Sequence, residues 1–247
     1  MHTYKMLIAF DGTNYSGWQV QPNGISIQGL IQKALKVLVK EDVVIHGSGR
    51  TDAGVHAIGQ IAHFKCHAPL DLFRFLQSLN ALLPPDIRVQ QMEETSPIFH
   101  SRYSAINKTY RYNLHLGRVE NPFTRLYSWH IREKIDLDKL KAAANLLIGT
   151  HDFTSFINDS DIGSAGRNPV RTMHLINVIS DGQTVSIEFK ANGFLYKMVR
   201  NLTGALVEIG KGKRPVEDIP RLLALKDRSK AGVGAPPHGL FLVQVEY

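Results

Sequence analysis

The segment from residue 46 to residue 56 combines three glycines with one arginine, Arg50, and one acid, Asp52. A phosphate-binding loop is the first interpretation, but Asp52 occupies the last position of the G-x-G-x-x-G pattern, and no Gly-Lys-Ser/Thr ending follows. A carboxylate there would repel phosphate. The pattern instead favours a loop that exposes Asp52 to a substrate, with Arg50 holding the acid ionised. A turn rich in Gly, Ser and Asp without any chemistry is the alternative.

Two neighbouring segments interleave cations with aromatic rings; they contain Arg102, Lys108, Tyr110, Arg111 and Tyr112. In a strand, Lys108, Tyr110 and Tyr112 share one face, and Arg111 lies on the other. Rings stack on unpaired bases and cations neutralise phosphates, so these residues are candidates for binding a nucleic acid. Half-buried sheet tyrosines beside solvated charges would give the same pattern.

A third segment, residues 193–201, begins an apolar stripe of helical period that continues to residue 209. These stripe residues are core residues. Arg200 and Asn201 fall toward the other side of the helix, where the arginine could pair with an acid. A solvated helix face explains the same arrangement.

Composition limits the class of protein. The chain has 247 residues, 43% of them hydrophobic, which is enough for a core, and 29 Lys+Arg against 22 Asp+Glu give a net charge of +7. This charge favours a polyanionic partner such as a nucleic acid. Cys66 is the only cysteine, which fits a reducing cytoplasm, and no metal-ligand spacing accompanies it. No stretch approaches the length of a membrane span, so we expect no membrane contact.

Apolar periodicity predicts the elements that must position these residues. In the first half it predicts a strand over 5–10, a helix behind a Ser26 cap, strands over 43–46 and 58–64, a helix over 71–83 and a strand over 87–92. This β-α-β-β-α-β order is typical of a ferredoxin-like domain.

The second half repeats the order. It contains predicted strands over 109–116, 173–179, 185–189 and 240–245, and predicted helices over 137–148, 194–209 and 216–225. We therefore expect an α+β fold of two ferredoxin-like halves, residues 1–104 and 105–247, with their sheets joined around a central basic cleft. Two loops, 158–169 and 228–237, are either segments that close over a large ligand or ordinary surface loops.

Taken together, these segments resemble the TruA family of tRNA pseudouridine synthases. The matching stretches are residues 49–56, 99–102, 110–112 and 198–201, with 10–13 and 15–19 near the start and 239–242 near the end. They follow the family's order over essentially the whole chain, and no motif position departs from the family pattern.

The resemblance implies isomerisation of uridine to pseudouridine in the anticodon arm of tRNA, at family positions 38, 39 and 40, by a homodimer without metal or cofactor. Asp52 matches the catalytic aspartate, which acts as the nucleophile, and Arg200 the basic residue that pairs with it. Arg50 matches an arginine that helps to hold the flipped nucleotide, and Tyr110 the base-stacking tyrosine. The other candidate substrate-binding residues are the cations Arg102, Lys108 and Arg111.

The chemistry agrees with the residues present. Glycoside hydrolysis usually needs two carboxylates, but here no water enters and the base is retained, so one carboxylate in a dry pocket could suffice. Whether Asp52 attacks the sugar to form an ester or removes a sugar proton to give a glycal stays open, as does whether Tyr110 also acts as a base. Two other classes compete: a non-catalytic RNA-binding protein and a nucleotide-dependent enzyme.

Overall fold

The computed structural model describes residues 1–158 and 168–247, which form ten β-strands and five α-helices. The predicted α+β class is confirmed. Contacts group the chain into two compact units: the first is Met1–Ile106 with Phe241–Tyr247, and the second is Asn107–Leu240. The last strand therefore contacts the first unit, although the sequence led us to expect it in the half formed by residues 105–247.

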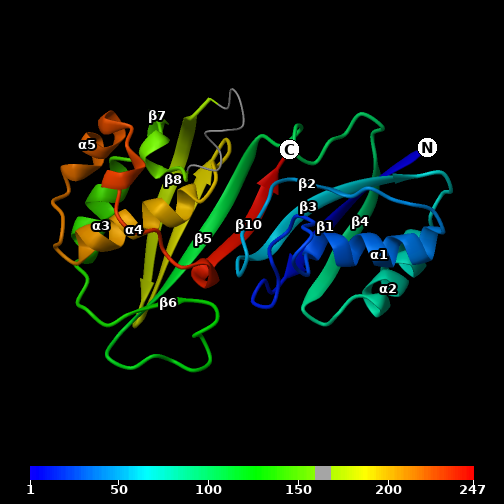
Figure 1. The fold of residues 1–247 in the computed structure, drawn as a ribbon, viewed down its shortest axis with the longest axis horizontal. Coiled ribbons are helices and arrows are strands. Elements are labelled where there is room, and N and C mark those ends of the chain that lie inside the picture. Colours follow the sequence, from blue (N-terminus) through cyan, green and yellow to red (C-terminus); the bar gives the residue numbers. More distant parts are fainter. Residues whose placement is uncertain (159–167) are drawn as a thin grey trace. The chain divides into compact units, whose positions relative to one another are not determined.

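The first unit has the strand order of a ferredoxin-like sheet. Its elements are β1 (His2–Phe10), α1 (Ile27–Val39), β2 (His46–Gly47), β3 (His56–Cys66), α2 (Leu72–Leu82), β4 (Ile87–Thr95) and β10 (Leu240–Glu246). β1 lies between β4 and β3 and is antiparallel to both, and β2 pairs antiparallel with β3. β10 adds a parallel pair to β3, with Phe241 opposite His56. Helices α1 and α2 contact each other beside these strands (Figure 1).

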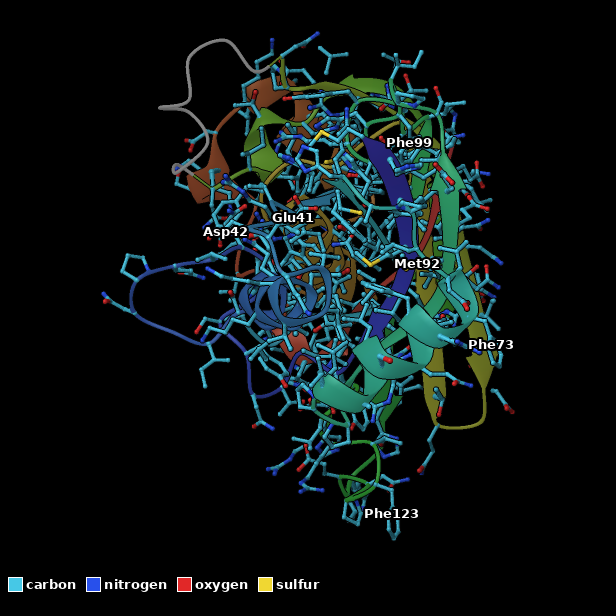
Figure 2. The ribbon with its side chains drawn as sticks, turned by 90° about the vertical axis from the view of Figure 1, so that its right-hand side faces the viewer. Glu41, Asp42, Phe73, Met92, Phe99 and Phe123 are labelled. Carbon is cyan, nitrogen blue, oxygen red and sulfur yellow. The ribbon has the colours of Figure 1, made fainter. Side chains whose placement is uncertain are left out.

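Capping and apolar faces explain both helices of this unit. The Ser26 hydroxyl accepts a hydrogen bond from the Gly29 amide, as the sequence predicted, and the Asp71 carboxylate caps α2 in the same way. The buried core comes from alternate residues of β1 and from one stripe of α1: Tyr4, Met6, Ile8, Phe10, Ile27, Ile31 and Leu35. Phe73 lies on the side of α2 that faces solvent and is 71% exposed (Figure 2).

The second unit holds a sheet in the order β5-β9-β8-β7. Its elements are β5 (Asn107–Leu116), β6 (Trp129–Ile131), α3 (Leu137–Asn145), β7 (Gly149–Asp152), β8 (Val170–Asp181), β9 (Thr184–Ala191), α4 (Met198–Gly210) and α5 (Asp218–Leu225). β5, β9, β8 and β7 pair antiparallel, while β6 pairs parallel with β5. α3 packs against α4 and β8.

Some predicted elements differ from those observed. The strand predicted over 43–46 was wrong except at its last residue, since β2 covers His46–Gly47. The helix predicted from residue 194 begins at Met198, because Lys197 adopts a left-handed conformation (φ 58°) that an α-helix cannot contain. The short strands β6 and β7 were not predicted, since three or four residues show no readable alternation. Most of the loop predicted over 158–169 lies outside the described residues. Within the described ranges, none of the helices combines the length and apolar character needed to span a bilayer.

Candidate active site

Asp52 lies in the loop that connects β2 to β3, at the first position of a β-turn. The Val55 amide donates to the Asp52 carbonyl over 3.1 Å, and Gly54 occupies the third position at φ +75°. That conformation is left-handed and favours glycine. The turn thus holds the half-buried Asp52 at the point where the chain reverses into β3.

The segment that follows β1 braces this loop. The Trp18 amide donates to the Thr51 carbonyl over 3.1 Å, and a Cβ atom on Gly17 would lie 2.4 Å from the same oxygen. A Cβ on Gly12 would lie 2.0 Å from the Val55 carbonyl oxygen. Both glycines belong to stretches that carried the family resemblance, 10–13 and 15–19, for which no role was predicted. In the structure they allow two backbone segments to approach closely.

Buried polar side chains fix the other arm of the loop. The Ser48 hydroxyl donates to Gln60 Oε1 over 2.7 Å, and Gln60 Nε2 donates to the Gly49 carbonyl over 3.0 Å. Ser48 and Gln60 are both fully buried. Because a buried amide is costly unless it is hydrogen-bonded, Gln60 specifies one position for this arm.

The ring of His56, which directly follows the loop, joins it to the residues that follow β1. The Gly12 amide donates to His56 Nδ1 over 3.0 Å, and Asp11 Oδ1 lies 3.1 Å from the same nitrogen. A backbone amide can only donate, so this hydrogen bond forms when the ring is neutral with its proton on Nε2. The approach of Asp11 becomes an ion pair only when His56 is protonated. The His56 ring also stacks on Phe241 of β10, with ring centroids 4.6 Å apart.

The other candidate residues of the first unit lie on its surface. Arg50 is exposed, and its Nε donates to Gln19 Oε1 over 3.2 Å. Arg102 is exposed beside Tyr103, with the guanidinium carbon 5.8 Å from the ring centroid. Both cations are placed to meet a large anion in solution, and their roles stay predictions.

In the second unit, Lys108, Tyr110 and Tyr112 share one face of β5, as the strand pattern predicted, and the role of Tyr110 in stacking stays a prediction. Tyr110 is 8% exposed and meets the Phe194 ring edge to face, with centroids 5.1 Å apart. Arg111 lies on the opposite face, where its Nη2 lies 2.7 Å from Oε1 of Glu188, its cross-strand neighbour on β9. The structure therefore groups Lys108 with Tyr110 and separates Arg111 from them.

Arg200 lies in the first turn of α4 and makes two hydrogen bonds with Ala235, one through its side chain and one through its backbone. Its Nε donates to the Ala235 carbonyl over 2.8 Å, and the Ala235 amide donates to the Arg200 carbonyl over 2.9 Å. Burial raises the pKa of Tyr112 well above its usual value, and the nearby charge of Arg200 partly offsets this rise. Arg200 thus lies close to the Tyr112 side of β5. Asp52 belongs to the first unit, so its pairing with Arg200 stays a prediction.

Among the described residues, no group of three or more His, Cys, Asp or Glu side chains could hold a metal ion. Cys66 is a buried thiol at the end of β3, and its Sγ lies 3.3 Å from the Ala68 carbonyl oxygen.

Comparison with known proteins identifies the class. A family model described as tRNA pseudouridine synthase matches residues 6–104 and 143–247. The chain is 56% identical to tRNA pseudouridine synthase A 1 of Protochlamydia amoebophila, covering all of this chain and 97% of that protein. It is 44% and 42% identical to the tRNA pseudouridine synthases A of Geotalea uraniireducens and Geobacter sulfurreducens, each covered completely. The chain belongs to the tRNA pseudouridine synthase family.

Proposed function

We propose that the protein isomerises uridine to pseudouridine at positions 38, 39 and 40 of the tRNA anticodon arm, with Asp52 as the reacting carboxylate. It is an isomerase and a tRNA pseudouridine synthase by its family. The modified tRNA positions and the roles of individual residues go beyond what the family membership shows. The observation that carries the proposal is the placement of Asp52 on a turn that two close glycine contacts and a buried Ser48–Gln60 pair hold in one conformation.

The reaction exchanges one bond for another at the sugar. The bond from the uracil nitrogen N1 to the sugar carbon C1′ breaks, the base turns, and a bond from C5 to C1′ forms. The proton on C5 then leaves to a base or to solvent and N1 takes up a proton, so the product is an isomer of the substrate. Asp52 can promote this by bonding to the sugar as an ester or by removing a sugar proton to give a glycal. In both routes the carboxylate must be fixed beside the sugar, which is what the braced turn provides.

The target uridine lies in or beside a helix, so it must flip out at a cost of a few kcal/mol. Stacking on Tyr110 offsets part of this cost, at about 1–3 kcal/mol for a base on an aromatic ring. Arg200 would pair with Asp52 and Arg50 would hold the flipped nucleotide. The remaining cations would contact phosphates: Arg102, Lys108 and Arg111.

We also propose that the protein is a homodimer and that it works on tRNA in the cytoplasm. The loop between β5 and β6 exposes several apolar side chains, which subunit contacts commonly bury: Val119, Phe123, Leu126 and Tyr127. Phe123 is 89% exposed at the edge of the unit (Figure 2). Light scattering on Phe123→Ser should show dissociation, whereas Phe73→Ser, equally apolar but on α2, should stay dimeric. Monomeric wild type would contradict this part.

Transcripts that carry uridine at only one of the three positions test the proposed site of action. The wild type should form pseudouridine in each of the three transcripts, and a transcript with cytidine at all three should yield none. A non-catalytic RNA-binding protein, the competing function, would bind all four transcripts and modify none. Modification confined to uridines outside the anticodon arm would contradict the proposed positions while leaving the isomerase activity intact.

A further inference from the structure

We propose that Arg228 and Asn201 are positioning residues that set the direction of the Arg200 guanidinium. This inference rests on the proposed role of Arg200 in the isomerisation. Both side chains act on the segment that carries the Ala235 carbonyl: Arg228 donates to the Gly232 carbonyl of that segment and to Asn201 Oδ1. The Ala235 carbonyl accepts from Arg200 Nε, and because a guanidinium is planar, fixing Nε fixes the plane in which its other donors point.

Arg228 reaches three groups at once with its fork of donors. Nη1 donates to the Gly232 carbonyl over 2.7 Å, Nη2 donates to Asn201 Oδ1 over 2.9 Å, and Nε approaches Asn158 Oδ1 at 3.4 Å. Gly232, at φ +77°, makes the bend that Arg228 holds. A lysine could not make these contacts together, because its donors all radiate from one nitrogen.

Asn201 follows Arg200 on α4 and anchors this arrangement in the core. It is 1% exposed, and its Nδ2 donates to the Phe156 carbonyl over 2.8 Å and to Asn158 Oδ1 over 3.0 Å. Its Oδ1 accepts from Arg228. A Cβ on Gly234 would lie 2.5 Å from that oxygen, so the segment passes directly over the amide. Both the oxygen and the nitrogen of the Asn201 side-chain amide are thus hydrogen-bonded, so the amide has one orientation.

The same segment is held at its other end and from the helix. The Tyr112 hydroxyl donates to the Pro236 carbonyl over 2.7 Å, and a Cβ on Gly204 would lie 2.0 Å from the Val233 carbonyl oxygen. Ala235 is completely buried between these contacts. Contacts before and after Ala235 in the chain therefore fix the position of its carbonyl. Arg228 supplies the contacts on the N-terminal side.

A double-mutant cycle tests whether Arg228 acts through Arg200. Arg228→Lys is combined with Arg200→Lys, which keeps a cation but has no Nε–H for the Ala235 carbonyl. The readout is single-turnover pseudouridine formation in a tRNA transcript. We expect Arg228→Lys to slow formation roughly tenfold to a hundredfold in the wild-type background. In the Arg200→Lys background, Arg228→Lys should change the rate by less than about twofold, because no guanidinium remains at position 200 for Arg228 to orient. The transcript's Kd should change less than about twofold in every variant.

Equal slowing in both backgrounds, or no slowing in the wild-type background, would overturn the inference. Arg221→Lys is the matched control, since Arg221 is an exposed arginine of α5 that pairs with Asp218, and it should keep the wild-type rate. If Arg228→Lys fails to fold by circular dichroism, Asn201→Asp replaces it under the same criteria, because it keeps the side-chain shape and loses both amide donors. A wild type that forms no pseudouridine would instead contradict the proposed function.

Discussion

Gly17 lies so close to Thr51 that a Cβ atom at position 17 would stand 2.4 Å from the Thr51 carbonyl oxygen. The next residue along the chain is Asp52, whose own carbonyl carbon would lie 3.0 Å from that Cβ. The loop that presents the carboxylate therefore depends on the absence of a side chain more than thirty residues earlier in the chain.

Gly17→Ala should displace the Asp52 loop and slow pseudouridine formation by at least about a hundredfold. Gly182→Ala is the matched control: Gly182 also has a positive φ, +59°, in the turn between β8 and β9, but nothing lies within 4 Å of its Cβ position. It should cost about 1–2 kcal/mol of stability from the backbone alone and leave the rate unchanged. Equal rates for the two variants in steady-state assays would contradict the bracing role of Gly17.

Tyr110→Ala and Tyr110→Phe separate the ring from the hydroxyl. If Tyr110 contributes by stacking, Tyr110→Phe should keep the tRNA Kd within about twofold, and Tyr110→Ala should weaken binding by about 1–3 kcal/mol. Filter binding at fixed salt concentration measures both. Equal weakening by the two variants would show that the ring is not the contributing part. The turnover of the phenylalanine variant then reports on the hydroxyl alone.

Lys108→Gln and Arg111→Gln test which face of β5 meets the RNA. A cation that neutralises a phosphate contributes about one to the slope of log Kd against log salt concentration. We expect Lys108→Gln to reduce that slope by about one and Arg111→Gln to reduce it less, because Glu188 already offsets the Arg111 charge. A larger reduction from Arg111→Gln in a salt titration would show that the Glu188 ion pair opens when tRNA binds.

The stability of the protein should depend on the protonation of His63. Burial, and secondarily the charges of His100, His46 and Lys65, lowers the pKa of His63 from its usual 6.5 to about 4. The folded protein thus keeps His63 neutral where the unfolded chain binds a proton. Its contribution is complete above pH 6.5 and declines between about pH 6.5 and 4, by on the order of 3 kcal/mol. Urea unfolding should show His63→Gln to be less pH-dependent than wild type. The exposed His174→Gln should match wild type, and identical pH profiles for all three would contradict the assignment.

Local signals predicted the frame of the molecule well. The Ser26 cap, the helical stripe of α1 and the alternation in β1 are encoded within a few residues of one another, and each appears in the structure. The start of α4 was wrong by four residues, because the left-handed Lys197 leaves no mark in an apolar pattern. Short strands such as β6 were missed because three residues show no readable alternation.

The candidate site was predicted only in part. Asp52 and Tyr110 stood out because acids in glycine-rich loops and rings among cations are visible in composition. The residues that brace them were not visible, since the contacts of Gly17 with Thr51 and of Arg228 with Asn201 join distant parts of the chain. For residues 228–237, the Gly, Ser and Pro content left open whether the segment closes over a large ligand or is an ordinary surface loop. In the structure, hydrogen bonds join it to Arg200 and Asn201 of α4.

Release of tritium from carbon five of uridine tests the central claim most directly, because isomerisation must expel the hydrogen at that position. Wild type and Asp52→Asn are compared on an unmodified tRNA transcript, with transcript binding measured in parallel. We expect release by the wild type and a rate at least about ten-thousandfold lower for Asp52→Asn, with binding retained. Release by Asp52→Asn at the wild-type rate would contradict the assignment of Asp52 as the reacting carboxylate.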